Sequence, residues 1–307
     1  MIRPPALAPG ARVALVAAAG PLADEAVDRA IARVREWGWE PVVGTHARER
    51  TGFLAGDDDG RAADLNAALR DPRVDGVWLL RGGYGTPRIV HRIDWDALAA
   101  RPCAVIGFSD NTALHLAAQQ KRVVTFHGPH PATVEFSAFS ADSLRRSVTR
   151  AEPAGLLPFP ATHPGRADTL VAGSAEGRLV GGNLSLLASL AGTPYTLDAR
   201  GAILFVEEVG EPAYRVDRML TQLILSGALD GVAGIAVGAF SETVDADRPD
   251  LPSAAEVVRE RLGPLGVPIA FGFPFGHIDE TWTLPEGVPA RLDADAGTLE
   301  VLEPAVE

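Results

Sequence analysis

Residues 12–130 alternate short apolar runs with stretches of helical periodicity, and this alternation is the strongest constraint on the fold. The runs ARVALVAAAG, EPVVGT, VDGVWLLRGG, CAVIGF and VVTFHGP are separated by patterns such as DEAVDRAIARVREWG and RAADLNAALRD. Repeated βα units of this kind predict an α/β domain with a mostly parallel, doubly wound sheet and helices on both faces. Ligands of such sheets bind outside the carboxyl ends of the strands.

The pattern changes near residue 150, which suggests a second domain. Residues 151–175 are rich in proline, glycine and alanine, and predict a linker or crossover. Residues 176–307 hold further strand and helix patterns, among them GAILFVEEVGE and AYRVDRMLTQLILSG, and end in a hairpin at ARLDADAGTLEVLE. A length of 307 residues favours two domains. We therefore predict an N-terminal domain over 1–150 and a smaller C-terminal α/β domain with its own sheet over 176–307.

Charge and composition exclude several classes of protein. The chain has 28 basic and 40 acidic residues, a formal net charge of -12, which argues against nucleic acid or an anionic membrane as a partner. Its single cysteine, Cys103, excludes an intrachain disulfide framework and a cysteine-based zinc site. No apolar run reaches the roughly 18 residues that span a bilayer, and the start does not resemble a signal peptide. We expect a soluble, cytoplasmic protein.

The stretch AVIGFSDNTALH places Ser109 between a predicted strand and a predicted helix. A serine at such a corner projects its hydroxyl clear of the sheet, and the next backbone N–H, that of Asp110, points at a bound group. The helix N-terminus adds positive potential for a developing oxyanion. The G-x-S-x-G spacing is incomplete because Asn111 holds the second glycine position. A plain helix-capping serine is the alternative interpretation.

The loop RGGYG follows the strand before Ser109 and is rich in glycine, which lets backbone amides approach a ligand closely. Gly82 or Gly83 could supply a second oxyanion donor beside the Asp110 amide. A phosphate-binding loop or a simple tight turn is the alternative, although the Walker lysine and the G-x-G-x-x-G spacing are absent.

A nucleophilic serine needs a base, and the base needs an orienting carboxylate. Of the seven histidines, His277 follows the apolar run PIAFGFPFG and so lies at the carboxyl end of a strand. Glu207 and Glu208 end the buried run AILFV, where a charge is costly unless exposed or partnered. All three could instead be ordinary polar residues after strands. His127 and His130 in HGPH could ligate a metal, but the intervening turn and the lack of a third ligand disfavour this.

These motifs together resemble the serine LD-carboxypeptidase family, which includes murein tetrapeptide carboxypeptidases and microcin-immunity peptidases. The resemblance runs from about residue 10 to the end and rests on WLLRGGYGT, VIGFSDNTALH, VGGNLSLLASLAGTPY, LFVEEVGEPAYRVDRMLTQL and GFPFGH, in that order. It implies a flavodoxin-like N-terminal domain, a homodimer and no metal or other cofactor. It also implies a Ser109, His277 and Glu207 triad, with the amides of Gly83 and Asp110 as the oxyanion hole.

The resemblance implies hydrolysis through an acyl-enzyme that releases D-alanine from a muropeptide tetrapeptide during cell-wall recycling. Two other functions stay open: a microcin-immunity peptidase that cleaves peptidyl-aminoacyl nucleotide analogues, for which Trp282 could stack on the base, and a non-catalytic small-molecule-binding protein. A substrate carboxylate calls for a cation or an amide nest. The sequence does not choose among Arg81, Arg88 and Arg215 for that role.

Overall fold

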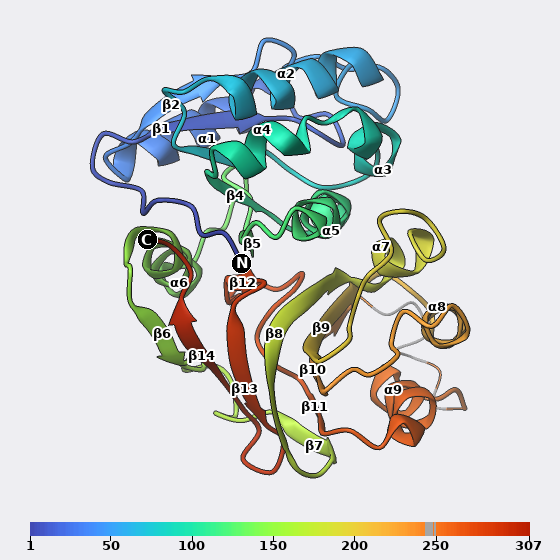
Figure 1. The fold of residues 1–307 in the computed structure, drawn as a ribbon. Coiled ribbons are helices and arrows are strands. Elements are labelled where there is room, and N and C mark those ends of the chain that lie inside the picture. Colours follow the sequence, from blue (N-terminus) through green and yellow to red (C-terminus); the bar gives the residue numbers. More distant parts are fainter. Residues whose placement is uncertain (243–247, 249) are drawn as a thin grey trace. The chain divides into compact units, whose positions relative to one another are not determined.

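The structure is a computed structural model that describes residues 1–242, 248 and 250–307. The chain divides into two compact units, each of which is built around its own sheet (Figure 1). The first unit comprises Met1–Glu152, Thr283–Gly287 and Pro304–Glu307, and the second comprises Pro153–Trp282 and Val288–Glu303. None of the helices in the described ranges is both long and apolar enough to cross a membrane.

The first unit contains a six-stranded sheet in the order β12-β5-β4-β3-β1-β2. Neighbouring strands from β5 to β2 are parallel, whereas β12 is antiparallel to β5. The order 2-1-3-4-5 of the first five strands is that of flavodoxin-like folds, so the predicted fold of the N-terminal domain is confirmed. The strands are β1 (Arg12–Val16), β2 (Glu40–Val43), β3 (Gly76–Leu79), β4 (Ala104–Gly107), β5 (Thr125–His127) and β12 (Leu284–Glu286).

Helices of the first unit follow the predicted alternation, and several carry clear start signals. Asp57 accepts a hydrogen bond from the Gly60 N–H at the start of α2, and Ser137 caps α6 in the same way. Helices α2, α3, α4 and α5 contact one another and form one layer. The helices are α1 (Asp24–Glu36), α2 (Asp58–Arg70), α3 (Thr86–Ile89), α4 (Trp95–Ala100), α5 (Thr112–Gln120) and α6 (Ala138–Thr149), with 3-10 turns η1 (Val90–Arg92) and η2 (Ser109–Asn111).

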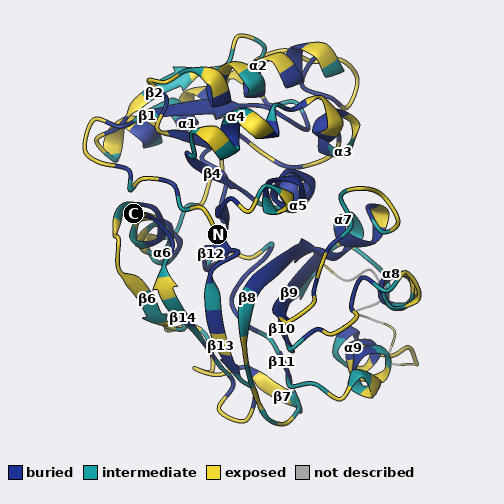
Figure 2. Cartoon of the chain, in the orientation of Figure 1, coloured by how far each residue is buried: buried dark blue, intermediate teal, exposed yellow. Residues whose placement is uncertain are grey.

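The second unit contains an eight-stranded mixed sheet in the order β6-β14-β13-β8-β9-β10-β11-β7. Strands β8 to β11 are parallel, and β9 at the centre is almost entirely buried (Figure 2). The strands are β6 (Pro153–Leu156), β7 (Asp168–Val171), β8 (Ser174–Asn183), β9 (Ala202–Val209), β10 (Gly234–Ser241), β11 (Ile269–Phe271), β13 (Pro289–Asp293) and β14 (Thr298–Pro304). The helices are α7 (Leu184–Ser189), α8 (Ala213–Leu225) and α9 (Ala254–Leu262), with η3 (Gly263–Leu265).

The course of the chain differs from the predicted boundaries in two places. Residues 151–175, expected as a linker, contribute β6 and β7, which are the two outermost strands of the second sheet. Proline is tolerated at sheet edges, where one row of N–H groups has no partner, so a proline-rich composition is compatible with edge strands. Within residues 176–307, β12 and the last four residues belong to the first unit instead. The predicted hairpin is present as β13 and β14.

Candidate active site

Ser109 lies where β4 ends and α5 is about to begin. It is the first residue of η2 and has a φ of 62°, in the left-handed region that few non-glycine residues adopt. Holding an L-residue there costs about 1–2 kcal/mol, which is typical of a serine displayed on a sharp strand-to-helix turn. Phe108 and Asn111 are the N-cap residues of η2 and α5, so Ser109 is not the helix cap of the alternative interpretation.

Asn111 and Gly107 hold this corner in shape. A Cβ on Gly107 would lie 2.9 Å from Cδ1 of Leu79 and 3.0 Å from Nδ2 of Asn111, so a larger residue would require one of these side chains to shift. The Asn111 Nδ2 atom donates to the Arg81 carbonyl at 3.3 Å and lies 2.9 Å from Nε2 of His130. The asparagine that stands in the second glycine position of the serine motif therefore ties the Ser109 corner to the RGGYG loop.

The RGGYG loop lies directly against Ser109. A Cβ on Gly82 would be 2.7 Å from Cβ and 2.9 Å from Oγ of Ser109. The Gly82 carbonyl accepts a hydrogen bond from the Gly20 N–H at 3.1 Å. Because a trans peptide directs its N–H opposite to its C=O, the Gly83 amide is turned away from Gly20. Gly83 itself has a φ of 109°, which favours glycine strongly.

Two backbone amides at this corner have no partner within the part of the chain that the structure describes. Neither the Gly83 N–H nor the Asp110 N–H donates a hydrogen bond to any described acceptor. Backbone N–H groups near a buried site normally donate a hydrogen bond. Two N–H groups without an acceptor beside one serine therefore require an explanation. An oxyanion that forms on a carbonyl attacked by Ser109 would provide the acceptor that both lack.

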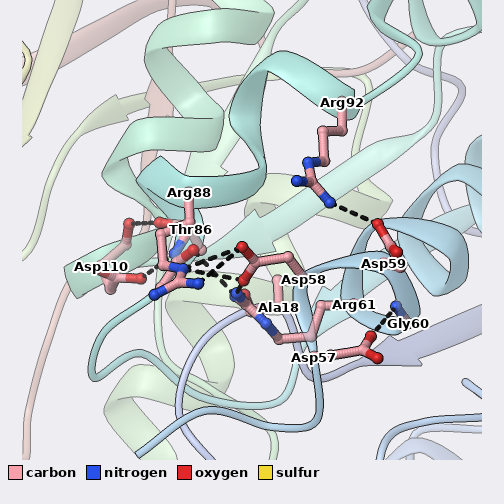
Figure 3. Close-up of polar contacts among 11 residues, drawn as sticks. Ala18, Asp57, Asp58, Asp59, Gly60, Arg61, Thr86, Arg88, Arg92 and Asp110 are labelled. Atoms are coloured by element: carbon pink, nitrogen blue, oxygen red, sulfur yellow. Dashed lines mark hydrogen bonds and ion pairs between the residues drawn. The ribbon is translucent and has the colours of Figure 1, made fainter.

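A buried arginine, Arg61, contacts the end of the loop at Gly85, and Figure 3 shows this arginine beside Ala18 and Asp58. Arg61 of α2 is fully buried, and its Nη1 donates to the carbonyls of Ala18 and Gly85 at 2.5 and 3.0 Å. Its charge is balanced by Asp58, whose Oδ1 lies 2.5 Å from Nη2. The arginine thereby fixes the segment after β1 and the end of the RGGYG loop relative to each other. Arg61 is not recognisable from the sequence as a residue that supports the site.

Thr86 links the same loop to Asp110. The Thr86 N–H donates to the Asp110 Oδ2 at 2.7 Å, and the Thr86 hydroxyl donates to the Asp110 carbonyl. Burial raises the pKa of the Asp110 carboxyl, although the hydrogen bonds from Thr86 oppose this shift. The peptide that carries the Asp110 amide is therefore anchored on the side chain and on the carbonyl, which fixes the direction of its N–H.

Glu207 and His277 form a hydrogen-bonded pair in the second unit. Glu207 lies in β9 and is fully buried, and its Oε2 is 2.6 Å from Nδ1 of His277. The other oxygen, Oε1, has no hydrogen-bond partner among the described residues. Gly276 allows the approach, because its φ is 112° and a Cβ there would lie 2.8 Å from the Glu207 Oε2. A buried carboxylate whose described partner is one imidazole matches an orienting residue.

Glu208 has a different environment from its neighbour, because successive side chains of a strand point to opposite faces. Its carboxylate accepts hydrogen bonds from the Ser185 N–H at 2.7 Å, the Ser185 hydroxyl at 2.8 Å and the Asn183 Nδ2 at 3.0 Å. Glu208 thus holds the start of α7. The alternation along the strand, which the sequence alone could not orient, leaves only Glu207 in contact with His277.

The pKa of His277 is shifted upward by its surroundings. Burial opposes protonation of the ring, but the hydrogen bond that the ring donates to Glu207 and the negative charge of that carboxylate outweigh burial, with smaller contributions from Glu208 and Glu242. The net direction is a pKa above the ordinary value for histidine. Nδ1 is the ring nitrogen that contacts Glu207, so proton transfer by this histidine would use Nε2.

His115 and Cys103 are buried in the first unit. His115 is fully buried, its Nε2 lies 2.8 Å from the Gly107 carbonyl, and burial lowers its pKa to about 4. Cys103 is buried, which raises the pKa of its thiol to about 12. The His127 and His130 pair is not joined by a third ligand, since the described residues contain no group of three or more His, Cys, Asp or Glu arranged for a metal.

Trp282 does not have the position expected of a base-stacking residue. Its side chain is 1% exposed, and Nε1 donates to the Pro158 carbonyl at 2.6 Å. Its ring packs against Phe159 and Phe273 with centroid separations of 5.2 and 5.7 Å. Trp282 is therefore a core residue of the second unit, and its burial does not support the possibility that it stacks on a nucleobase.

The structure places the candidate residues in two groups. Ser109, Gly83 and Asp110 come together at the carboxyl ends of β3 and β4 in the first unit, and Glu207 and His277 pair in the second.

Comparison with known proteins shows the family to which the chain belongs. Models of the LD-carboxypeptidase N-terminal and C-terminal domains match residues 13–128 and 176–292. A putative carboxypeptidase of Streptomyces coelicolor is 44% identical, over 100% of this chain and 98% of its own length. A murein tetrapeptide carboxypeptidase of Pseudomonas aeruginosa is 34% identical, over 92% of this chain and 94% of its own.

Solved structures share the fold. A muramoyltetrapeptide carboxypeptidase from Oxalobacter formigenes has a TM-score of 0.82 and 32% identity, and the match covers 94% of this chain and 97% of that one. The microcin C7 self-immunity protein MccF in complex with glutamyl sulfamoyl guanosine has a TM-score of 0.88 over 100% of both chains. At 23% identity this second match shows the fold alone.

These similarities define the class of protein: the chain is a serine carboxypeptidase, an enzyme that hydrolyses peptide bonds. More narrowly, it belongs to the LD-carboxypeptidase family. The resemblance inferred from the motifs is confirmed, and the interpretation as a non-catalytic binding protein is not supported.

The contact between Gly82 and Ser109 gives a first prediction. Gly82→Ala would place a Cβ 2.7 Å from the Ser109 Cβ, so the loop or the serine must shift. We expect kcat/KM of the carboxypeptidase reaction to fall about 30- to 100-fold, because misplacement of Ser109 would cost about 2–3 kcal/mol of transition-state stabilisation. Gly263→Ala is the control, because no atom lies within 4 Å of the added Cβ. Full activity of Gly82→Ala would contradict the close packing of this loop on Ser109.

Proposed function

We propose that this enzyme releases the terminal D-alanine from L,D-linked muropeptide tetrapeptides in cell-wall recycling. Relatives named as murein peptide or murein tetrapeptide carboxypeptidases, at 37% and 34% identity, support this substrate class. The observation that carries the proposal is the hydrogen bond between the buried Glu207 and His277, because it supplies an oriented base for a serine enzyme.

In the proposed mechanism, Ser109 is the nucleophile, His277 the general base and acid, and Glu207 the orienting carboxylate. Nε2 of His277 takes the proton of the Ser109 hydroxyl as Oγ attacks the carbonyl carbon on the L-centre side of the bond. The negative charge of Glu207 stabilises the imidazolium, and the amides of Gly83 and Asp110 stabilise the oxyanion. D-alanine leaves with the proton from His277, and water then hydrolyses the acyl-enzyme with His277 again as base.

We also propose that the enzyme acts in the cytoplasm and as a homodimer. Both proposals rest on the family resemblance, and the absence of a membrane-spanning helix among the described residues is compatible with them. The net charge of -12 disfavours nucleic acid and anionic membranes as partners. Light scattering coupled to size-exclusion chromatography measures the mass in solution, and a monomer at micromolar concentration would contradict the dimer.

The reaction is tested by mass spectrometry of L-Ala-D-Glu-diaminopimelate-D-Ala after incubation with the enzyme. We expect loss of one D-alanine and no further cleavage. The same peptide ending in L-alanine is the matched control, and it should stay intact because its last bond is not L,D-linked. If the tetrapeptide is untouched, the muropeptide proposal fails, and peptidyl-aminoacyl sulfamoyl nucleotides then test the microcin-immunity alternative.

A further inference from the structure

A carboxypeptidase that removes one residue must recognise the free carboxylate of that residue. This carboxylate lies close to the attacked carbonyl, because consecutive Cα atoms are only about 3.8 Å apart. Its cationic partner therefore has to come from a segment that touches the oxyanion loop. About half of the 28 basic residues form ion pairs with acidic neighbours within the described residues, and those without such a neighbour are the candidates for binding a substrate carboxylate.

Two of the three arginines that the sequence offers for this role are engaged elsewhere. Arg88 forms a bidentate ion pair with Asp58, in which Nε and Nη2 each lie 3.0 Å from a carboxylate oxygen. Arg215 pairs with Glu211 at 3.1 Å, one helical turn earlier. A substrate carboxylate would have to displace these carboxylates, and the gain from exchanging one anion for another is small.

Arg81 is different from both. It directly precedes Gly82, is exposed, and has no acidic partner anywhere in the described part of the chain. Its Nη1 donates to the Pro21 carbonyl at 2.9 Å, which steadies the side chain without neutralising it. The guanidinium stem passes beside the oxyanion loop, since a Cβ on Gly20 would lie 3.5 Å, and one on Gly83 3.9 Å, from Nε of Arg81.

Arg81 also lines a cavity of about 210 Å³ that belongs wholly to the first unit. The other walls are mostly small and apolar, and they include Leu22, Ala26, Leu80, Ala132 and the ring of His130. His130 connects this cavity to the Ser109 corner, because its Nε2 lies 2.9 Å from the Asn111 Nδ2. A cavity lined by one cation and by apolar side chains matches the carboxylate and the methyl group of a terminal alanine.

We propose that Arg81 binds the terminal carboxylate of the substrate and that this cavity receives the departing residue. Arg81 is then the residue that makes the enzyme an exopeptidase: the carboxylate is bound by a charge-assisted hydrogen bond that an amide or an extended chain cannot form. The inference rests on the proposed function, because the leaving residue is taken to be D-alanine. The carboxylate does not change during the reaction, so Arg81 acts mainly on substrate binding.

The test compares the tetrapeptide with its C-terminal carboxamide, in the wild type and in Arg81→Met, Arg81→Lys and Arg88→Met. We expect the wild type to prefer the acid about 100-fold in kcat/KM, chiefly through KM. Arg81→Met should lower kcat/KM for the acid to the value for the amide, while kcat/KM for the amide stays within about threefold of its wild-type value. Arg81→Lys should restore part of the preference, and Arg88→Met should keep it in full. An unchanged acid-to-amide ratio in Arg81→Met overturns the proposal.

Equilibrium binding of the two peptides to Ser109→Ala, with and without Arg81→Met, separates this inference from the proposed function. If the wild type cleaves neither peptide, but the acid binds Ser109→Ala more tightly than the amide and Arg81→Met removes the difference, then the proposed function fails and the role of Arg81 stands. If turnover occurs and binding shows no preference for the acid that depends on Arg81, then the role of Arg81 fails and the function stands. Absence of both turnover and binding overturns both.

Discussion

Ser109→Ala is expected to lower kcat for D-alanine release by at least about 10⁴-fold. Without the hydroxyl no acyl-enzyme can form. The residual rate enhancement over the uncatalysed reaction in water then comes only from the oxyanion donors and from substrate binding. The φ of 62° at Ser109 is equally unfavourable for alanine, so the variant keeps the backbone strain of the wild type. The free energy of unfolding should therefore change by less than about 1 kcal/mol. Single-turnover kinetics and denaturant unfolding measure the two effects.

Ser109→Gly is the informative companion variant. It also lacks the nucleophile and should be as inactive as Ser109→Ala, but glycine adopts a positive φ without strain. We expect it to be more stable than Ser109→Ala by about 1 kcal/mol. Substantial turnover by either variant would show that another residue attacks the substrate, and equal stability of the two would show that the corner stores no strain.

The course of the first sheet was predictable because it follows from local patterns. The alternation of apolar runs and amphipathic helices in residues 12–130 sets strand and helix periods directly. The short strands β6, β7 and β12 were not predicted. Each has three or four residues, and each lies at the edge of a sheet. Such strands are defined by the partner that they pair with rather than by their own composition, and proline in two of them hides them further.

The candidate site was predictable to a similar extent. Ser109 follows the end of β4 closely, as an apolar run that stops at polar residues predicts, whereas His277 lies six residues beyond Phe271, the last residue of β11. The choice of Glu207 over Glu208 came from the family resemblance and agrees with the observed contact to His277. Arg61 was not predictable, because its partners Ala18 and Gly85 lie 43 and 24 residues away and meet only in the folded unit. The one sequence feature that points to a buried charge is the position of Arg61 at the start of the alanine-rich pattern RAADLNAALRD.

Glu207→Gln is expected to lower kcat by about 10³- to 10⁴-fold and to move the acid side of the pH–rate profile. Glutamine keeps the size of the side chain, but it has no charge to stabilise the His277 imidazolium and does not enforce a proton on Nδ1. In the wild type, the Glu207 hydrogen bond and charge raise the pKa of His277 against the effect of burial. Removal of this charge leaves burial as the larger influence, so the pKa of His277 falls.

The sign of the pH shift follows from the role of the base. His277 must be neutral to accept the Ser109 proton, so kcat/KM declines as the pH falls through the pKa of His277. A lower pKa in Glu207→Gln moves this decline to lower pH, even though the plateau rate is reduced. The pH dependence of kcat/KM and the NMR titration of the His277 ring should move in the same direction.

Glu208→Gln separates this electrostatic effect from structural damage. Glu208 is the next residue of β9, but it binds Ser185 and Asn183 at the start of α7 and contributes little to the pKa of His277. Its replacement should reduce the free energy of unfolding by about 1–2 kcal/mol, because buried hydrogen bonds to a charged acceptor are weakened. The acid side of the pH–rate profile should stay nearly in place. If Glu207→Gln and Glu208→Gln moved the profile equally, or if neither moved it, then the group that titrates is not a His277 paired with Glu207, and the assignment of the base would have to change.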